Sequence, residues 1–281
     1  MDQSGTGKFG RIRPTVLLLT NLYNQHEAED IYLSRRLREH FNVALSNPLD
    51  CEAIEDDADL ILVRNTWPNF DYKEQIDEFK ARVVRKGLLT YNPFTGKGDF
   101  RGKGYLVELY RLGYPVIPSA DELGDLSDLP ETDMFFAKPK YKCDNIETFS
   151  ATREQLSSVW LKDYIIQPYI DFTCEISFYF IDGQFVYAFT TRRKVGDHDF
   201  TEYRPTEGDL AFARKFLEWD NMECGLQRVD ACRTRDGMLQ LVELEDLDPF
   251  LYLLRVSDTT REKMVDGIVK ALHSRLGRAI R

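Results

Sequence analysis

The first third of the chain alternates short apolar runs with longer amphipathic segments. The apolar runs are typical of buried strands, and the segments between them repeat apolar positions at helical spacing. Strands are expected at 15–20, 42–45, 60–63 and 88–91, and helices at 30–40 and 70–86. This alternation predicts a parallel sheet covered by helices, in which ligands bind beyond the carboxyl ends of the strands. Residues 21–24 and 64–67 occupy such positions.

The pattern changes after residue 92, where a glycine-rich stretch at 96–104 begins. Further helices are expected at 105–112, 208–219 and 260–276, and extended segments at 116–119, 134–138 and 164–167. Two alternating segments, 174–192 and 227–245, each carry a central Asp-Gly pair, a strong hairpin signal. The expected fold class is therefore α/β (α+β).

The C-terminal hairpin gathers carboxylates on one face. A two-residue turn at Asp236-Gly237 would place Asp230 opposite Glu243 and Arg228 opposite Glu245. The other face would be apolar and part of the core, with Val229, Ala231, Val242 and Leu244. Opposed carboxylates repel, so a cation is expected between them, and an oxygen-only set of ligands favours Mg²⁺. The alternative is an exposed face on which Arg228 pairs with Glu245.

The central hairpin carries a second polar face. A two-residue turn at Asp182-Gly183 would place Glu175 opposite Thr190 and Thr173 opposite Arg192. A carboxylate and a guanidinium on one face suit a ribose and a phosphate. They suit a diagonal salt bridge equally well.

Two lysines and one strand end are further candidates for nucleotide binding. Lys103 opens a helix after glycines that do not have the spacing of a Walker motif, and alone it is better explained as a solvated lysine. Lys138 ends an apolar run, where a lysine needs a partner. Residues 167–170 (Gln-Pro-Tyr-Ile) end another apolar strand and offer amide, backbone and aromatic surface for an adenine ring, although an ordinary strand exit looks the same.

The order of these features resembles the ATP-grasp superfamily of carboxylate–amine ligases over residues 92–275. The segments at 63–67 (VRNTW), 113–119 (GYPVIPS), 167–170 (QPYI), 228–230 (RVD) and 242–249 (VELEDLDP) are most similar to the D-cycloserine synthetase-like branch. The resemblance implies a Rossmann-like N-terminal domain at 1–92 and two ATP-grasp subdomains at 93–170 and 171–281.

The resemblance also implies roles for individual residues, with ATP and Mg²⁺ as cofactors. Phosphates would be bound by Lys103 and Lys138, the adenine and ribose by Gln167, Tyr169, Ile170 and Glu175, and Mg²⁺ by Asp230, Glu243 and Glu245. Arg192 would steady the transferred phosphate together with Lys138, although Arg193 and Lys194 compete for this role. Substrate contacts are expected from Arg64, Arg228 and Asp248.

The implied reaction joins a small, amino-acid-like carboxylate to an amine through an acyl phosphate. One departure is the segment after Lys138, Pro139 to Asn145, which lacks the glycines that usually cover the phosphates. This departure keeps open a nucleotide-binding regulatory or scaffold protein with degenerate catalysis. An ATP-grasp kinase that transfers phosphate without ligation is the other alternative.

Composition narrows the classes of partner. The net charge is −10 without an extended basic block, which argues against nucleic acid, and no apolar run is long enough to span a bilayer. Five cysteines without a C-x-x-C pair and four scattered histidines give little basis for disulfides, zinc or a histidine-based triad. The polar start of the chain lacks the apolar core of a signal peptide. We therefore expect a cytoplasmic protein acting on small molecules, with a homodimer as one candidate assembly.

Overall fold

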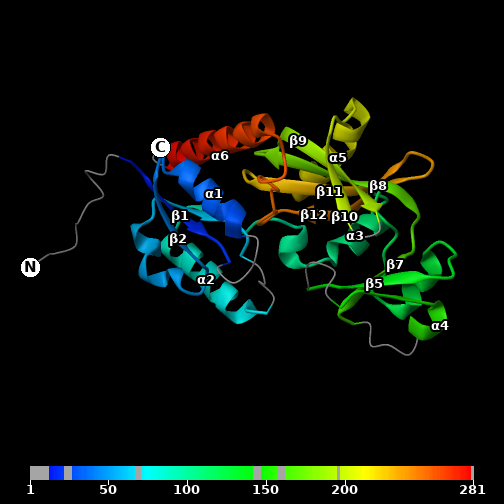
Figure 1. Cartoon of the computed structure of the whole chain (residues 1–281). Helices are drawn as coiled ribbons and strands as arrows, with labels where there is room; N and C mark the ends of the chain where they lie inside the picture. The colour runs from blue at the N-terminus through cyan, green and yellow to red at the C-terminus, as the bar shows by residue number, and fades with distance from the viewer. Residues whose placement is uncertain are drawn as a thin grey trace, which may run out of the picture.

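Three β-sheets make up the framework of the protein (Figure 1). The computed structural model describes residues 13–21, 27–66, 71–141, 147–156, 162–194 and 197–279. A four-stranded sheet belongs to the N-terminal part, a three-stranded sheet to the middle of the sequence, and a five-stranded sheet to the C-terminal part. No helix among the described residues is both long and apolar enough to cross a membrane.

The N-terminal sheet is parallel, with the strand order β2-β1-β3-β4. Its strands are β1 (Thr15–Leu19), β2 (Asn42–Ser46), β3 (Leu60–Val63) and β4 (Thr90–Tyr91), and its helices are α1 (Glu27–Leu37) and α2 (Lys73–Lys86). The apolar side chains of β1 and β3 are buried on both faces of the sheet, because helices cover both faces. The predicted parallel sheet is confirmed, and α2 ends at Gly87 in the left-handed conformation that a glycine adopts freely.

The five-stranded sheet is antiparallel, with the strand order β10-β9-β8-β11-β12. It consists of β8 (Phe172–Ile181), β9 (Gln184–Lys194), β10 (Asp197–Tyr203), β11 (Leu226–Thr234) and β12 (Leu239–Glu245). Helices α3 (Tyr105–Arg111) and α5 (Glu207–Asp220) pack their apolar sides on one face of this sheet. The sequence analysis missed β10, because its many charged residues hide the alternation.

The three-stranded sheet has the order β6-β5-β7 and is the smallest. It consists of β5 (Phe135–Pro139), β6 (Phe149–Ala151) and β7 (Tyr164–Pro168), with the short helix α4 (Arg153–Leu156) beside it. Backbone hydrogen bonds between Ala120 and Ile166 attach the segment that follows α3 to this sheet.

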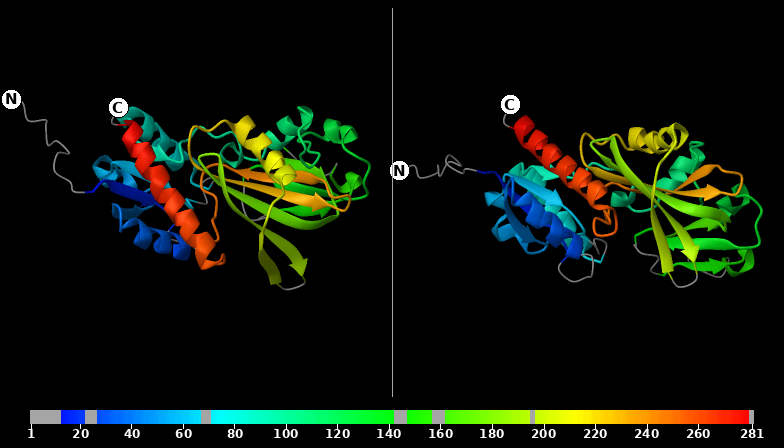
Figure 2. Two further views of the ribbon diagram at one scale, coloured as in Figure 1. Left: turned by 90° about the horizontal axis from the view of Figure 1, so that it is seen from above. Right: turned by 45° about the horizontal axis from the view of Figure 1, so that its top comes forward.

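The C-terminal helix α6 (Asp258–Ala279) packs against both the N-terminal sheet and the five-stranded sheet. One buried cluster contains residues of α6, of α1, β1 and β3, and of β8 and β9. Figure 2 shows α6 lying along the N-terminal sheet and reaching the five-stranded sheet. The helix therefore fixes the position of the N-terminal sheet relative to the C-terminal hairpins.

The C-terminal hairpin has the predicted register at its functional end. Asp230 is opposite Glu243, and Arg228 is opposite Glu245. The turn, however, contains three residues, 235–237, and a bulge leaves Val242 without a partner. The extra turn residue and the bulge residue compensate for each other. The expectation that Val242 belongs to the core is wrong, because the bulge turns its side chain towards a cavity.

The predicted register of the central hairpin is wrong by one residue. The two-residue turn at Asp182-Gly183 is present, but a bulge leaves Val186 unpaired. Beyond the bulge, Glu175 is opposite Thr191 rather than Thr190. A shift of one residue exchanges the two faces of a strand. The face shared by Glu175 therefore carries Thr191 instead of the predicted Thr190 and Arg192.

Candidate active site

A cavity of about 1070 Å³ lies between the three sheets and the N-terminal helix α2. It reaches the carboxyl end of β3 at Asn65, as expected for a parallel sheet. Most of the residues that the sequence singled out line it: Lys103, Lys138, Gln167, Tyr169, Ile170, Glu175, Arg228, Asp230, Glu243, Glu245 and Asp248. Arg64 does not line it, and the side chain of Arg192 lies outside the described part of the structure.

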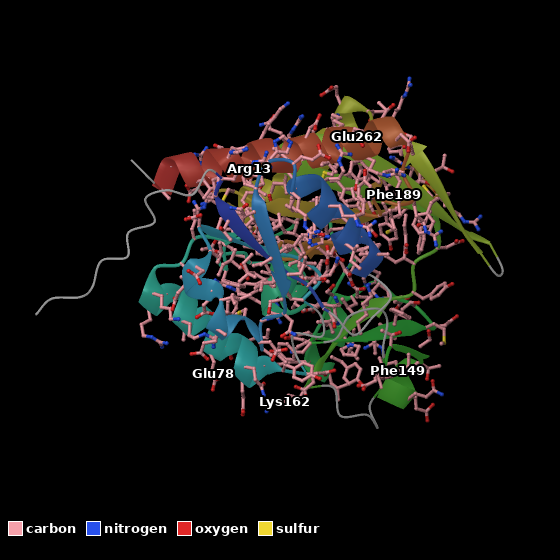
Figure 3. All side chains as sticks on the ribbon, turned by 60° about the vertical axis from the view of Figure 1, so that its left-hand side comes forward. Arg13, Glu78, Phe149, Lys162, Phe189 and Glu262 are labelled. Atoms are coloured by element: carbon pink, nitrogen blue, oxygen red, sulfur yellow. The ribbon has the colours of Figure 1, made fainter. Side chains whose placement is uncertain are left out.

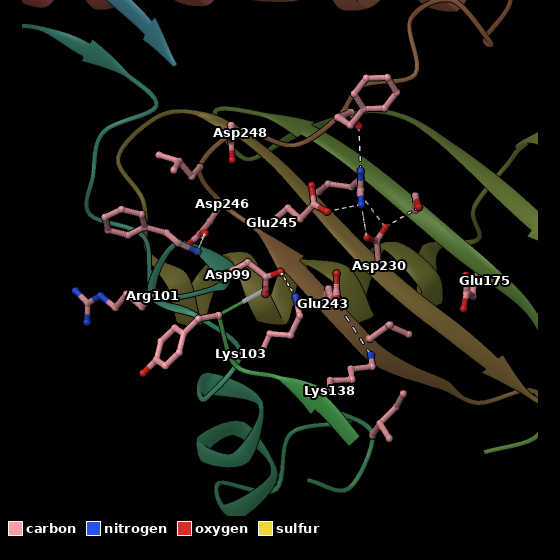
Figure 4. Close-up of a pocket in the computed structure, with 18 of the residues that line it drawn as sticks. Asp99, Arg101, Lys103, Lys138, Glu175, Asp230, Glu243, Glu245, Asp246 and Asp248 are labelled. Carbon is pink, nitrogen blue, oxygen red and sulfur yellow. Dashed lines mark hydrogen bonds and ion pairs between the residues drawn. The ribbon is translucent and has the colours of Figure 1, made fainter. Parts of the chain in front are cut away.

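Three carboxylates converge on one face of the C-terminal hairpin (Figure 4). Asp230 of β11 and Glu243 and Glu245 of β12 each offer an oxygen, and these oxygens lie within 4.8 Å of one another. All three side chains are partly exposed to the cavity. The oxygen-only set of donors and its open side fit a divalent cation such as Mg²⁺, which keeps positions for water and phosphate oxygens.

Arg228 holds two of these carboxylates. Its guanidinium donates to both oxygens of Asp230 at 2.8–3.1 Å, to Glu245, and to the carbonyl of Phe250 at 3.1 Å. Ser177 donates to Asp230 at 2.6 Å. Burial raises the pKa of Glu245 well above its usual range despite Arg228, and the charges of Asp230 and Glu243 add to this effect. The Arg228–Glu245 pair, which belonged to the alternative of an exposed face, is present, but Arg228 also pairs with Asp230 and this face lines the cavity.

Two lysines reach the third carboxylate. Lys103 Nζ lies 3.1 Å and Lys138 Nζ 4.0 Å from the same oxygen of Glu243, and both lysines are largely buried. Burial opposes ionisation of Glu243, but the two ammonium groups outweigh it and lower the pKa of Glu243 to about 2. The lysines that resemble phosphate contacts are therefore next to the proposed metal ligands.

Asp99 is a member of this group that the sequence analysis missed. Its Oδ2 accepts from Lys103 at 3.0 Å, while its Oδ1 is buried without a hydrogen-bond partner. Burial raises the pKa of Asp99, and Lys103 only partly offsets this effect. Asp99 is four residues before Lys103, at the spacing that brings side chains together on a helical turn, and this spacing was the available signal.

Asp246 holds the loop that carries Asp99 and Lys103. Its buried carboxylate accepts from the backbone N–H groups of Gly98 at 2.7 Å and Phe100 at 2.9 Å. A Cβ atom on Gly98 would lie 2.5 Å from the carbonyl oxygen of Leu244, so this approach requires glycine. Asp246 therefore links the end of β12 directly to the lysine loop. No role for Asp246 was expected from the sequence.

The predicted adenine-binding segment lies at the end of β7. Gln167 is buried and donates from Nε2 to Ser119 Oγ at 2.9 Å, and the N–H of Tyr169 donates to Met134 O. The ring of Tyr169 is 59% exposed. Apolar side chains of the cavity wall accompany them, namely Ile117, Phe136, Phe172 and Val242. This mixture of apolar surface and a few polar groups is typical of a nucleotide-base pocket.

Arg64 contradicts the sequence analysis. Its side chain is 0% exposed and pairs with Glu29 at 2.7 Å and Asp30 at 3.4 Å. It also donates to the carbonyl of Pro249 at 2.6 Å. The expected contact between Arg64 and a substrate is therefore wrong, because the guanidinium is enclosed between the N-terminal sheet and the segment after β12. Glu29 and Asp30 gave no signal in the sequence.

Asp248 lies at the opposite end of the group from Lys138 (Figure 4). Its Oδ2 accepts from the N–H and the hydroxyl of Thr66, both at 2.7 Å. Among the described residues, nothing pairs with Oδ1 of Asp248. The side chain lines the cavity and is partly exposed. This Oδ1, which no described residue contacts, is placed to accept a hydrogen bond from a ligand.

Solved structures with similar folds are found, whereas no protein-family model and no curated protein matches the sequence. D-cycloserine synthetase DcsG is 19% identical, with a TM-score of 0.73 over 91% of this chain and 99% of that one. D-alanine–D-alanine ligase from Bacillus anthracis in complex with ATP is 12% identical, with a TM-score of 0.66 over 94% and 99%. The ATP-grasp ligase PsnB is 12% identical, with a TM-score of 0.63 over 92% and 99%. The chain therefore has the ATP-grasp fold.

Proposed function

We propose that the protein is an ATP-dependent carboxylate–amine ligase. The observation that carries this proposal is the convergence of three carboxylates and two buried lysines in one cavity, which apolar side chains such as Ile117 and Phe136 also line. A nucleotide lying along this cavity would have its base near Gln167 and its phosphates between the lysines and the carboxylates. The fold supports a ligase, since proteins of similar structure include D-cycloserine synthetase and D-alanine–D-alanine ligase.

The proposed reaction has two steps. A substrate carboxylate oxygen attacks the γ-phosphorus of ATP, the bond to the β,γ-bridging oxygen breaks, and ADP leaves with an acyl phosphate in place. An amine then attacks the acyl carbon, and inorganic phosphate leaves with formation of the amide. Such chemistry depends on positioning and charge rather than on a histidine base.

Different groups of residues in the cavity would bind the metal, the phosphates and the substrate. Asp230, Glu243 and Glu245 would hold Mg²⁺, which offsets the charge of the phosphates when it is bound. Lys103 and Lys138 would donate to phosphate oxygens, and Lys138 would also stabilise the transferring group together with Arg192. Arg228 keeps Asp230 and Glu245 in place and offers charge to a substrate carboxylate. Glu175 is on the cavity wall near the expected ribose.

A small amino-acid-like substrate is the proposed class. D-cycloserine synthetase and D-alanine–D-alanine ligase are named for such products. In this chain, Asp248 offers an amino group the carboxylate oxygen that no residue in the described part of the chain contacts. The ranges 1–92, 93–170 and 171–281 are our proposed division into an N-terminal domain and two ATP-grasp subdomains. The cytoplasm is the proposed location, since the composition has the balance of a cytoplasmic enzyme.

Two other functions are favoured by one observation each. The glycine-free segment after Lys138 favours a nucleotide-binding regulatory protein with degenerate catalysis. The pairing of both lysines with Glu243 is equally compatible with a kinase, because phosphate transfer alone uses the same charges.

The test is a screen of carboxylate and amine pairs for Mg²⁺-dependent release of ADP, with mass spectrometry of the products. A ligase yields ADP, phosphate and an amide, and Glu243→Gln reduces its turnover at least 100-fold. A phosphorylated product would identify a kinase. ATP binding without ADP release across the panel would favour the regulatory protein.

A further inference from the structure

One wall of the cavity is aromatic. Four rings form it, from Phe189, Phe200, Phe250 and Tyr252, and all four line the cavity. Their centroids are 4.6–5.3 Å apart in consecutive contacts. Phe189 is nearly buried, whereas the other three rings are partly exposed. The guanidinium of Arg255 lies over the ring of Phe200, 4.9 Å from its centroid, so a ligand would contact only those parts of the rings that line the cavity.

The aromatic wall is next to the proposed reaction centre. The carbonyl of Phe250 accepts from Arg228 at 3.1 Å, and Arg228 holds Asp230 and Glu245. Asp248 is two residues before Phe250 and lines the same cavity, with Oδ1 unpaired among the described residues. One end of the cavity thus combines a carboxylate oxygen, for an ammonium group, with aromatic surface.

Two elements from different parts of the chain build the aromatic wall. Phe189 and Phe200 belong to the β9–β10 hairpin, and Phe250 and Tyr252 to the segment between β12 and α6. Figure 3 shows Phe189 beside this hairpin, well away from Phe149 of the three-stranded sheet. Tyr252 has φ of 53°, a left-handed conformation that is costly for a bulky residue. This backbone brings its ring against Phe189, Phe200 and Phe250.

We propose that the aromatic wall and Asp248 form a subsite for an amino acid with an aromatic or large apolar side chain. The proposal rests on the ligase function and specifies its substrate class. The ammonium group would be held by Asp248 Oδ1, and the side chain would cover the rings of Phe200 and Tyr252. Aromatic contact and apolar burial both favour such a ligand over a small one.

Equilibrium binding to the full chain tests the subsite without requiring turnover. Calorimetry would compare phenylalanine with alanine, both enantiomers of each, in the presence of Mg²⁺ and ADP. We expect phenylalanine to bind at least tenfold more tightly. Phe200→Ala would raise the Kd of phenylalanine about tenfold and leave the Kd of ADP unchanged, Phe200→Leu would have a smaller effect, and Asp248→Asn would weaken both amino acids.

Phe185→Ala is the matched control, because Phe185 is also a partly buried ring of the five-stranded sheet, on β9 next to the β10 strand of Phe200, but it packs on Phe180 away from the cavity. Equal affinities for phenylalanine and alanine, or equal effects of the Phe185 and Phe200 variants, would overturn the subsite. Selective binding of phenylalanine without ADP release for any amine would leave the subsite standing and remove the ligase function. ADP release with small amino acids only would support the ligase function and overturn the subsite.

Discussion

Two clusters, each made of one arginine, one aspartate and one glutamate, lie in different environments in this protein. Arg228 is paired with Asp230 and Glu245, and Arg64 is paired with Glu29 and Asp30. The first cluster faces the cavity and shares it with Glu243 and the lysines, whereas Arg64 and its partners are at most 1% exposed. One guanidinium between two carboxylates is therefore not by itself a functional site.

The surroundings of the two clusters explain the difference. The cavity cluster has an open side, so its excess negative charge can attract a cation. The enclosed Arg64 cluster is bound by backbone groups: Glu29 accepts from the N–H groups of Leu251 and Leu253, and Arg64 donates to Pro249. It fastens the segment after β12 to the N-terminal sheet. The Arg64 cluster is a structural clamp, and the Arg228 cluster is part of the proposed site.

Removing the enclosed guanidinium should have the largest effect. Arg64→Leu leaves two buried carboxylates without a cation, which typically costs about 3–5 kcal/mol. Chemical denaturation should show this loss in the free energy of unfolding. Arg228→Leu should cost less, because its carboxylates are reached by solvent. Equal losses for the two variants would contradict the distinction between clamp and site.

The enclosed cluster should also give the stability an unusual dependence on pH. Burial raises the pKa of Glu29 to about 7, against the opposing charge of Arg64. The folded state therefore holds the Glu29 proton more tightly than the unfolded chain, and this contribution is lost as pH rises from about 4.5 to 7. It amounts to about 3 kcal/mol at most. Unfolding curves across this range should show the decline in the wild type and a flatter profile in Glu29→Gln.

A single methyl group added at Gly98 should disrupt the contact between the C-terminal hairpin and the loop that carries Lys103. A Cβ atom at Gly98 meets the carbonyl of Leu244, so Gly98→Ala should cost about 1–3 kcal/mol of stability and displace Lys103. The KM for ATP should rise as a result. Gly104→Ala is the control on the same loop, since nothing lies within 4 Å of its added Cβ. An unchanged KM in Gly98→Ala would separate the loop from nucleotide binding.

The smallest effect is expected from removing the hydrogen bond that Ser177 donates to Asp230. Ser177→Ala removes a 2.6 Å hydrogen bond to that carboxylate and should raise the Mg²⁺ concentration for half-maximal turnover about tenfold. Thr173→Ala is the control on the same strand, because the hydroxyl of Thr173 donates to the carbonyl of Arg233 at 3.0 Å and not to any carboxylate among the described residues. An identical Mg²⁺ dependence in the two variants would show that Asp230 does not depend on Ser177.

The two hairpins show how far register can be predicted from a turn signal. Both Asp-Gly pairs mark real turns, and both hairpins contain a bulge that alternation in the sequence does not reveal. In the C-terminal hairpin, a longer turn compensates for the bulge, so the Asp230–Glu243 pairing was predicted correctly. In the central hairpin nothing compensates, and Thr191 replaces Thr190 opposite Glu175.

Local sequence patterns could not predict which side chains are buried where distant segments of the chain meet. The sequence placed Arg64 after a strand, where ligands often bind, but its partners come from two other places in the chain, Glu29 and Asp30 from α1 and Pro249 from the segment after β12. Asp246 and Asp248 look alike in the sequence, yet Asp246 is buried and holds the backbone of the loop that carries Lys103, whereas Asp248 is partly exposed on the cavity wall. Only the tertiary arrangement distinguishes a clamp from a ligand site.

The most direct measurement compares one carboxylate of the proposed site with one of the clamp. Mg²⁺-dependent ADP release, with a productive carboxylate and amine pair, would be measured for Glu243→Gln and Glu29→Gln and expressed per folded molecule. We expect Glu243→Gln to lose at least 100-fold in turnover and Glu29→Gln to retain turnover within a few-fold of the wild type. Full turnover in Glu243→Gln would contradict the assignment of the metal site.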